Sequence, residues 1–422
     1  MTHPRYALLA LLLATAPSIA RADNPSSDKP PAPDTPAAKT EPELPPNRDE
    51  FIPLPILGGS SDIGLQVGVQ GSYVRFREGY FPHRLRLDLV LSTSIKDDER
   101  GLRLAQHYEM VHIDVPELVK DLRFDARVVF IRAVDAPWYG VGNATPYLPL
   151  PTPPGTSSAY YYVGQTVGGS AMARLKTGTP IEVVFYTRGR FLSLDAAPGS
   201  KLAADLATGT ITGGESEYLH TVASGIIMDG RDTEVLTRTG YYYTLGFGGT
   251  LGSAESIRYG EGSFSLAHYA SLAPSVIFAH RFLGSMKFGN VPFYELQQGD
   301  VFNPQYLVGG NRGVRGVRLG RYAGLAKAVA NTELRFLPLP RFKVFKSSLL
   351  IGATSFFDAG RVFTAYAARP ETDGTVLGLK WGVGGGLFFD WDHVQIFRID
   401  AAYSPDQRGQ PMSFYFDNGF LF

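Results

Sequence analysis

The sequence predicts an all-β fold: a 16-stranded antiparallel transmembrane β-barrel of the bacterial outer membrane, with a loop folded inward between strands 11 and 12. Three observations predict it. An export signal opens the chain, polarity alternates residue by residue throughout residues 51–422, and the chain ends on the aromatic strand SFYFDNGFLF. Strands that cross a membrane alternate in this way when one face meets lipid and the other lines a wet lumen.

Residues 1–22 have the three parts of a signal peptide. Arg5 supplies a positive charge, Tyr6–Ala16 form an apolar stretch, and Ala20–Ala22 have the A-x-A form of a cleavage site. The apolar stretch is about half of the roughly 20 residues that a spanning helix needs. We therefore expect export with cleavage near Ala22 rather than a membrane anchor.

Residues 23–50 are rich in proline and acidic residues and nearly devoid of large apolar side chains. Such a segment cannot bury enough surface to offset its ordering entropy, so it is interpreted as a disordered linker. It could serve as a plain tether or as a docking segment for a periplasmic partner.

Composition excludes several kinds of site. The chain has no cysteine, which removes disulfides, zinc–thiolate sites, thiol nucleophiles and a lipidated cysteine. The formal net charge of zero argues against a nucleic-acid binder. No G-x-S-x-G motif is present, and His107 and His112 should lie on opposite faces of one strand, so they cannot share a metal. An enzyme is the least favoured reading, and no cofactor is expected.

The alternation is clearest in the stretch RLRLDLVLS. There Leu85, Leu87 and Leu89 point to one side, and Arg86 and Asp88 to the other. A soluble β-sandwich would also alternate, but the charged polar faces, the many strands, the lack of domain breaks and the export signal favour the barrel. The loops at 135–158 and 195–215 are expected to be extracellular. The predicted strands are residues 62–76, 85–94, 100–114, 122–134, 159–176, 180–194, 216–229, 240–251, 257–270, 275–288, 304–309, 326–337, 349–359, 379–390, 394–404 and 412–422.

The last predicted strand carries Phe414, Phe416, Phe420 and Phe422 on one face, interrupted by Asn418. We expect this face to meet lipid. An aromatic residue at the end of such a strand is typical of an outer-membrane assembly signal.

The stretch VGGNRGVRGVRLGRYAG, residues 308–324, places an arginine at every third position: Arg312, Arg315, Arg318 and Arg321. Its glycines oppose a helix, and a phosphate-binding loop would need a helix after it, whereas a strand is predicted there. Another interpretation is an extracellular loop whose arginines face water or lipopolysaccharide phosphates, which suits Arg318 and Arg321.

The segment GGNRGVRGV, residues 309–317, resembles the signature loop of the Omp85 superfamily, the BamA/TamA or bacterial surface antigen D15 barrels. Its signature positions are Gly309, Gly310, Val314 and Val317, with Val317 where an aromatic residue is usual. The resemblance extends over residues 51–422 through five further segments: WYGVGN (138–143), DGRD (229–232), GNVPFYE (289–295), NTELRF (331–336) and FFDAGRVF (356–363).

The resemblance implies that the loop folds back into the lumen and that Arg315 pairs with Glu333 and Asp358 on the next two strands. A guanidinium can bind a carboxylate in a bidentate fork and stack on an aromatic ring such as that of Phe356. Gly316 and Gly360 complete this set. Without the resemblance, the three charged residues would be read as ordinary lumen charges.

The resemblance also implies a weak seam between the first and last strands, where an imperfectly paired edge can template an incoming strand. The expected seam residues are Gly64, Gly68 and Gly71 in the first strand and Gly419 and Phe422 at the end of the last.

The implied function is assistance in inserting or translocating proteins, or lipids, at the outer membrane. The implied partners are unfolded outer-membrane or secreted proteins, membrane lipids and lipopolysaccharide. Family members commonly carry POTRA domains before the barrel, and residues 23–50 are too short and proline-rich to form one. A passive porin-like channel and a scaffold barrel with a periplasmic or membrane partner are the alternatives.

Overall fold

The computed structural model describes residues 46–80, 82–98, 101–254, 256–344, 347–392, 395–406 and 412–422. The predicted signal peptide and all of the predicted linker up to residue 45 lie outside these residues. Among the described residues, neither helix α1 (Lys201–Ala207) nor helix α2 (Pro370–Asp373) is long and apolar enough to cross a membrane.

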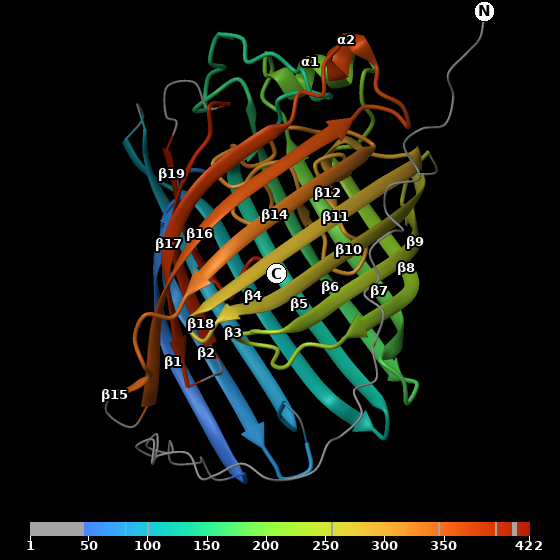
Figure 1. Ribbon diagram of the computed structural model, residues 1–422. Coiled ribbons are helices and arrows are strands. Elements are labelled where there is room, and N and C mark those ends of the chain that lie inside the picture. The colour runs from blue at the N-terminus through green and yellow to red at the C-terminus, as the bar shows by residue number, and fades with distance from the viewer. Residues whose placement is uncertain are drawn as a thin grey trace, which may run out of the picture. The chain divides into compact units, whose positions relative to one another are not determined.

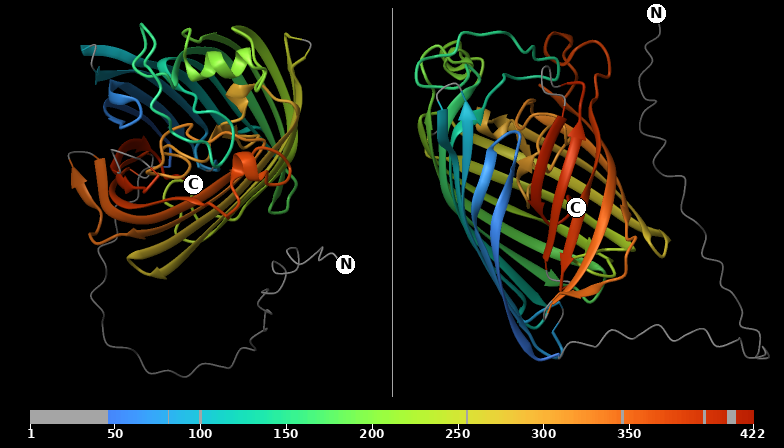
Figure 2. Two further views of the ribbon diagram at one scale, coloured as in Figure 1. Left: turned by 90° about the horizontal axis from the view of Figure 1, so that it is seen from above. Right: turned by 90° about the vertical axis from the view of Figure 1, so that its left-hand side faces the viewer.

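One antiparallel sheet closes on itself as a barrel (Figures 1 and 2). It contains 17 strands, but two of them, β14 and β15, pair with opposite ends of β16 and therefore share one position, which leaves 16 around the wall. The predicted barrel is confirmed. The wall strands are β1 (Arg48–Ser60), β2 (Gly64–Phe76), β3 (Leu85–Asp98), β4 (Gly101–Val119), β5 (Leu122–Pro137), β6 (Tyr161–Lys176), β7 (Ile181–Asp195), β8 (Ser216–Asp229), β9 (Gly240–Gly252), β10 (Arg258–Ala273), β11 (Val276–Asn290), β14 (Ala326–Phe336), β15 (Phe342–Val344), β16 (Ser347–Phe363), β17 (Lys380–Trp391), β18 (Gln395–Tyr403) and β19 (Met412–Asn418).

The two faces of the wall differ as the alternation predicts. On β3, Leu87, Leu89 and Leu91 are exposed on the outside, whereas Asp88 is buried on the other side. On β16, Phe357 is exposed between two buried neighbours. An apolar outer surface around a lumen lined by charged side chains is the construction of a barrel that spans a membrane.

The number of strands is right, but one wall strand was not predicted and one predicted strand is not part of the wall. Residues 48–60, read as linker and unassigned chain, form β1, so the predicted first strand at 62–76 is in fact β2. Residues 304–309 are not part of the wall: the pairing found there joins β12 (Gln298–Gly299) to β13 (Gln305–Tyr306). The sequence did not predict β1 because it contains Pro53 and Pro55, and proline in a strand is confined to edges and bulges.

These changes alter the boundaries of the loop that was predicted to fold inward. The connection between the eleventh and twelfth wall strands, β11 and β14, runs over residues 291–325 and contains a short 3-10 helix, η1 (Phe293–Glu295), as well as β12 and β13. The linker boundary also moves, since residues 48–50 belong to β1.

Long connections gather at one end of the barrel (Figure 1). The predicted loops at 135–158 and 195–215 fall there, after β5 and β7, and α1 lies in the second of them. Trp138 is buried against Phe293 of η1, and its indole N–H donates to Asp205 of α1 over 2.9 Å. These loops therefore pack on one another and on the start of the connection after β11.

The end of the chain departs from the prediction. Phe414 and Phe416 on β19 are exposed on the outer face as expected. Phe420 and Phe422 lie on the other side of the wall, where their rings contact the guanidinium of Arg335 on β14. The chain turns inward at Gly419, whose φ is +79°, so the expected row of four lipid-facing aromatic residues is wrong for its last two members.

Candidate functional site

Arg315 is fully buried against three carboxylates. Its Nε and Nη2 donate to Asp358 Oδ2 and Oδ1 over 2.7 and 3.1 Å, which is a bidentate fork. Its Nη1 donates to Glu333 Oε1 over 2.8 Å and to Asp400 Oδ2 over 3.3 Å. The guanidinium carbon lies 3.5 Å from the ring centre of Phe356, close enough for a cation–π interaction.

Strand register explains why these groups meet. Glu333 on β14 stands opposite Phe356 on β16, and Asn331 stands opposite Asp358, so the side chains share the lumen face of adjacent strands. The structure thus brings together Arg315, Glu333, Asp358 and Phe356, as the family resemblance implies.

Asp400 on β18 was not among the predicted site residues. Alternation in QIFRIDAAY places Asp400 on the lumen face together with Arg398. That pattern alone could have marked it as a further acid for the loop.

Two further buried arginines pair with the acids that bind Arg315. Arg335 Nη2 lies 2.9 Å from Glu333 Oε2, and Arg398 Nε lies 2.9 Å from Asp400 Oδ2. Counting Arg315, Arg335 and Arg398 against Glu333, Asp358 and Asp400 gives three cations and three anions, all with at most 1% of the side chain exposed. Removing one partner from such a cluster leaves an uncompensated buried charge, which typically costs about 3–5 kcal/mol.

Glycines make room for this contact. Gly316 has a φ of +89°, a conformation that side chains disfavour. A Cβ on Gly382 of β17 would lie 1.8 Å from the carbonyl oxygen of Arg315, and one on Gly360 would lie 2.9 Å from Val314. The wall therefore approaches the backbone of the loop too closely for any side chain at position 382.

The signature residues on either side of Arg315 form an apolar core. Val314 and Val317 are fully buried in a cluster with Leu283, Leu307, Val308, Tyr322, Val329 and Val362. Gly309 and Gly310 both have positive φ, and the N–H of Gly310 donates to the carbonyl of Val317 over 2.9 Å. Val317 thus packs in the core in the place where the family usually has an aromatic residue.

The other three arginines have different surroundings. The side chain of Arg312 is 45% exposed and its Nη2 lies 3.5 Å from Asp417. Arg318 lies 5.8 Å from the ring centre of Tyr147. Arg321 is buried and donates to the carbonyl of Thr145, so the interpretation that it faces water or lipopolysaccharide is wrong.

A second buried ion cluster was missed at the sequence level. Glu295 of η1 is fully buried and pairs with Arg190 of β7 and with Lys287 of β11, whose Nζ lies 3.2 Å away. Lys287 also lies 2.6 Å from Glu261. The segment GNVPFYE contains Glu295, but one acidic residue after an aromatic pair gave no sign of its partners.

Among the described wall strands, β1 and β19 share the shortest ladder. A single residue pair, Ser60 and Tyr415, is in register across this seam, whereas β1 pairs with β2 at every position from Arg48 to Ser60. The N–H of Ser61 donates to the carbonyl of Phe414 over 3.2 Å, and the N–H of Phe414 donates to Ser61 Oγ over 3.1 Å. Figure 2, right, shows the blue β1 beside the red β19.

The predicted seam residues lie near this junction but not on it. Gly64, Gly68 and Gly71 are in β2, which pairs continuously with β1 on one side and β3 on the other. Gly419 and Phe422 follow β19 and have left the wall. The placement of these five residues at the seam is therefore wrong, because β1 stands between the three glycines and β19.

The arginine loop, residues 308–324, contacts both sides of the seam. On the β19 side, the N–H of Gly316 donates to the hydroxyl of Tyr415 over 3.0 Å and Asn311 Nδ2 donates to Asp417 over 2.9 Å. On the β1 side, the N–H of Leu319 donates over 3.2 Å to Asp62, in the turn between β1 and β2. A rearrangement of the loop would therefore affect both edges.

Among the described residues, no group of three or more histidine, aspartate or glutamate side chains could hold a metal ion. The acids around Arg315 are instead neutralised by arginines, so the cluster acts through charge pairing.

Solved structures of two bacterial proteins share this architecture. The chain is similar to BamA from Haemophilus ducreyi lacking POTRA domains 1–3, with a TM-score of 0.55 at 13% identity over 88% of this chain and 70% of that one. It is also similar to CdiB from Escherichia coli, with a TM-score of 0.50 at 14% identity over 90% of this chain but only 63% of CdiB. Neither family models nor curated protein sequences give a match. The barrel and these likenesses agree: the chain has the fold of the Omp85-type outer-membrane barrels.

Proposed function

We propose that this protein assists the insertion or translocation of proteins at the bacterial outer membrane, through a seam between β1 and β19 that the arginine loop gates. The observation that carries the proposal is the contact of one loop with both sides of a junction held by a single residue pair. The fold shared with BamA and CdiB supports it.

In this mechanism the arginine loop folds into the lumen, and Arg315 holds it there. While the guanidinium is bound by Asp358 and Glu333, Gly316 and Leu319 keep Tyr415 and Asp62 in place. Displacement of the loop removes both contacts at once. The two wall edges are then joined by the Ser60–Tyr415 pair, its neighbouring hydrogen bonds and the hydrogen bond from Asn418 to Gln70 of β2.

An opened seam offers main-chain donors and acceptors to an extended segment of another protein, which adds as a strand. Its substrate would be an unfolded outer-membrane or secreted protein. We extend the proposal to lipids of the outer membrane, including lipopolysaccharide, which an open seam would face, and to a periplasmic partner bound by residues 23–50.

A crosslink at the seam tests the proposal in this cysteine-free chain. Ser61→Cys combined with Phe414→Cys joins the residue after β1 to β19, where the N–H of Ser61 donates to the carbonyl of Phe414. Antiparallel neighbours of this kind have a Cα separation of about 5.5 Å, which suits a disulfide. The matched control, Ala401→Cys with Phe414→Cys, joins β19 to β18 instead. Insertion of an unfolded barrel protein into vesicles is the readout.

The oxidised seam pair should abolish insertion, reduction should restore it, and the control pair should have no effect. Full insertion activity with the seam crosslinked would reject gating at this junction.

A passive channel is the second candidate, favoured by the charged lumen face. Single-channel conductance separates the two. A barrel filled by its loop should give a low, erratic current that rises when residues 309–321 are deleted, whereas a porin-like channel should conduct steadily with the loop in place.

A further inference from the structure

Strand β1 carries two prolines, Pro53 and Pro55, in the middle of the edge that faces the seam. The hydrogen bond from Ser61 to Phe414 crosses the seam. Because main-chain groups of a strand alternate in direction with a period of two, the odd-numbered residues of β1 point their N–H and C=O groups toward β19. Proline has no N–H.

The pairing of β1 with β2 gives the same orientation for the main-chain groups of the two prolines. All 13 positions from Arg48 to Ser60 are paired with β2 without a shift in register. A proline whose nitrogen pointed at β2 would interrupt that ladder. Both prolines therefore present a carbonyl acceptor but no donor to the seam.

Extending the observed seam register shows what these prolines oppose. Ser60 stands opposite Tyr415, so in an antiparallel ladder each earlier residue of β1 would stand opposite the next later residue of β19. Pro55 would face Phe420, and Pro53 would face Phe422. Both are positions at which the two strands would exchange a pair of hydrogen bonds, and at each position one of the two bonds cannot form.

Residues 419–422 do not take up this register. Gly419 turns the chain with its positive φ and donates its N–H to the carbonyl of Ile396 over 2.8 Å. The guanidinium carbon of Arg335 lies 3.7 Å from the ring centre of Phe420, and its Nη2 donates to the main-chain oxygen of Phe422 over 3.2 Å.

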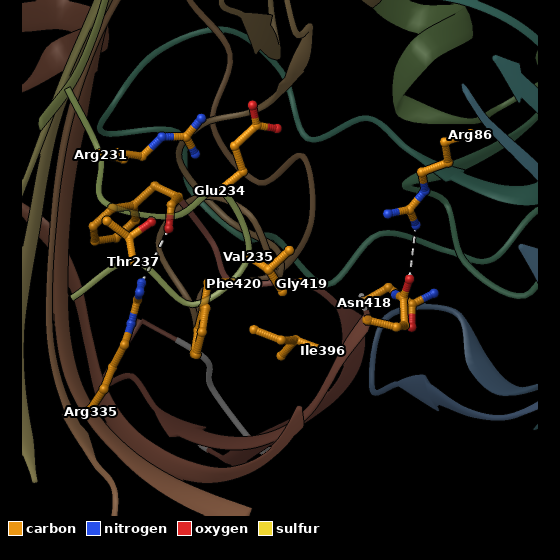
Figure 3. A pocket seen from close by; sticks show the side chains of 12 residues that line it. Arg86, Arg231, Glu234, Val235, Thr237, Arg335, Ile396, Asn418, Gly419 and Phe420 are labelled. Carbon is orange, nitrogen blue, oxygen red and sulfur yellow. Dashed lines mark hydrogen bonds between the residues drawn. The ribbon is translucent and has the colours of Figure 1, made fainter. Parts of the chain in front are cut away.

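In this position the segment forms one wall of a cavity of about 380 Å³. Figure 3 shows Gly419 and Phe420 facing Val235 and Thr237, which belong to the connection between β8 and β9.

We propose that Pro53 and Pro55 are positioning residues that limit the length of the seam. They deny two hydrogen bonds to Phe420 and Phe422, which lie against the lumen face instead, and so they keep the end of the chain from pairing with β1 at Pro55 and Pro53. The functional meaning of this inference rests on the proposed function. A substrate segment that added to this edge as a strand would also lack the two hydrogen bonds from Pro53 and Pro55, and it could therefore be released. The structural part of the inference is independent of that function.

The test replaces both prolines by valine, which supplies the two missing N–H donors, favours strands and keeps the outward face apolar. Leu54→Cys and Leu421→Cys would stand opposite each other in the extended register. A disulfide between them in the folded barrel therefore reports that residues 419–422 have paired with β1. The control Phe51→Val with Leu57→Val alters two exposed residues on the same edge that already have an N–H.

The ratio of crosslinked to uncrosslinked protein should rise about fivefold with Pro55→Val alone and about 25-fold with both valines. Each added hydrogen bond contributes about 1 kcal/mol, which shifts an equilibrium about fivefold. The control should leave this ratio unchanged. An unchanged disulfide yield in folded double and single valine variants would overturn the proposal. A raised yield without any change in insertion would keep the inference and count against the proposed function.

Discussion

The main-chain N–H of Gly316, the residue after the buried Arg315, donates to the phenolic hydroxyl of Tyr415 over 3.0 Å. Tyr415 is also the residue that pairs with Ser60 across the seam. One side chain thus links the charge cluster at Arg315 to the junction between the first and last strands.

Tyr415→Phe should weaken that link without disturbing packing, because it removes only the hydroxyl. The buried N–H of Gly316 loses its acceptor, which should lower the free energy of unfolding by about 1–3 kcal/mol. Urea titration of the barrel in detergent measures this. Tyr403→Phe, an exposed tyrosine on the neighbouring strand, is the control, and equal effects of the two changes would contradict the link.

Arg315→Ala should have a larger effect, because it leaves Asp358 and Glu333 buried without their shared cation. We expect a loss of about 3–5 kcal/mol, seen as faster proteolysis of residues 308–324 and a lower temperature for the mobility shift of the barrel in detergent. Arg315→Lys should be intermediate, since an ammonium cannot form the fork to Asp358.

The matched control for Arg315 is Arg312→Ala, three residues earlier in the same loop. Its side chain is 45% exposed and lies 3.5 Å from Asp417, and such an ion pair contributes under about 1 kcal/mol. Similar losses from both alanine variants would mean that the Arg315 cluster stabilises nothing beyond ordinary surface charge.

The sequence was sufficient for those features that depend on a local period. Alternation identified the barrel and placed Asp88 and Asp358 on the lumen face, since a strand changes face at every residue. The pairing of Arg315 with Glu333 and Asp358 came from the family resemblance, because no local pattern shows which lumen charges meet across 18 or 43 residues.

The features that were missed depend on position in the sheet. Pro53 and Pro55 argue against a strand until β1 is known to be an edge at the seam. Phe420 and Phe422 keep the alternation of β19, yet Gly419 ends the strand, and the alternative contact with Arg335 comes from a strand far away in sequence. Glu295 was missed for the same reason, since its partners lie on β7 and β11.

Gly382→Ala should disrupt the approach of the loop to the wall. The added Cβ would lie 1.8 Å from the carbonyl oxygen of Arg315, so either β17 or the loop must move. Overpacking of this kind costs about 1–3 kcal/mol, and it should raise the single-channel conductance if the loop is displaced from the lumen. Gly249→Ala on β9, where a Cβ meets nothing within 4 Å, is the control and should change neither quantity.

Asp300, between β12 and β13, should make stability depend on pH. Burial, together with the nearby charge of Glu261, raises its pKa from 3.8 to about 6. The folded chain therefore holds a proton between about pH 4 and pH 6 that the unfolded chain has lost, and the free energy of unfolding falls as the pH rises through this window. At about 1.4 kcal/mol per pH unit, the loss reaches at most about 3 kcal/mol.

Asp300→Asn should remove this loss. An amide oxygen can still accept the N–H groups of Phe302 and Asn303, and asparagine tolerates the φ of +80° at this position. The variant should match the parent near pH 4 and become more stable than it as the pH rises to 6, with a constant gap above that, as measured by urea titration at each pH. Asp195→Asn, at an exposed position, gives the background effect of removing one negative charge. A gap between Asp300→Asn and the parent that does not change with pH would show that Asp300 is not the titrating group.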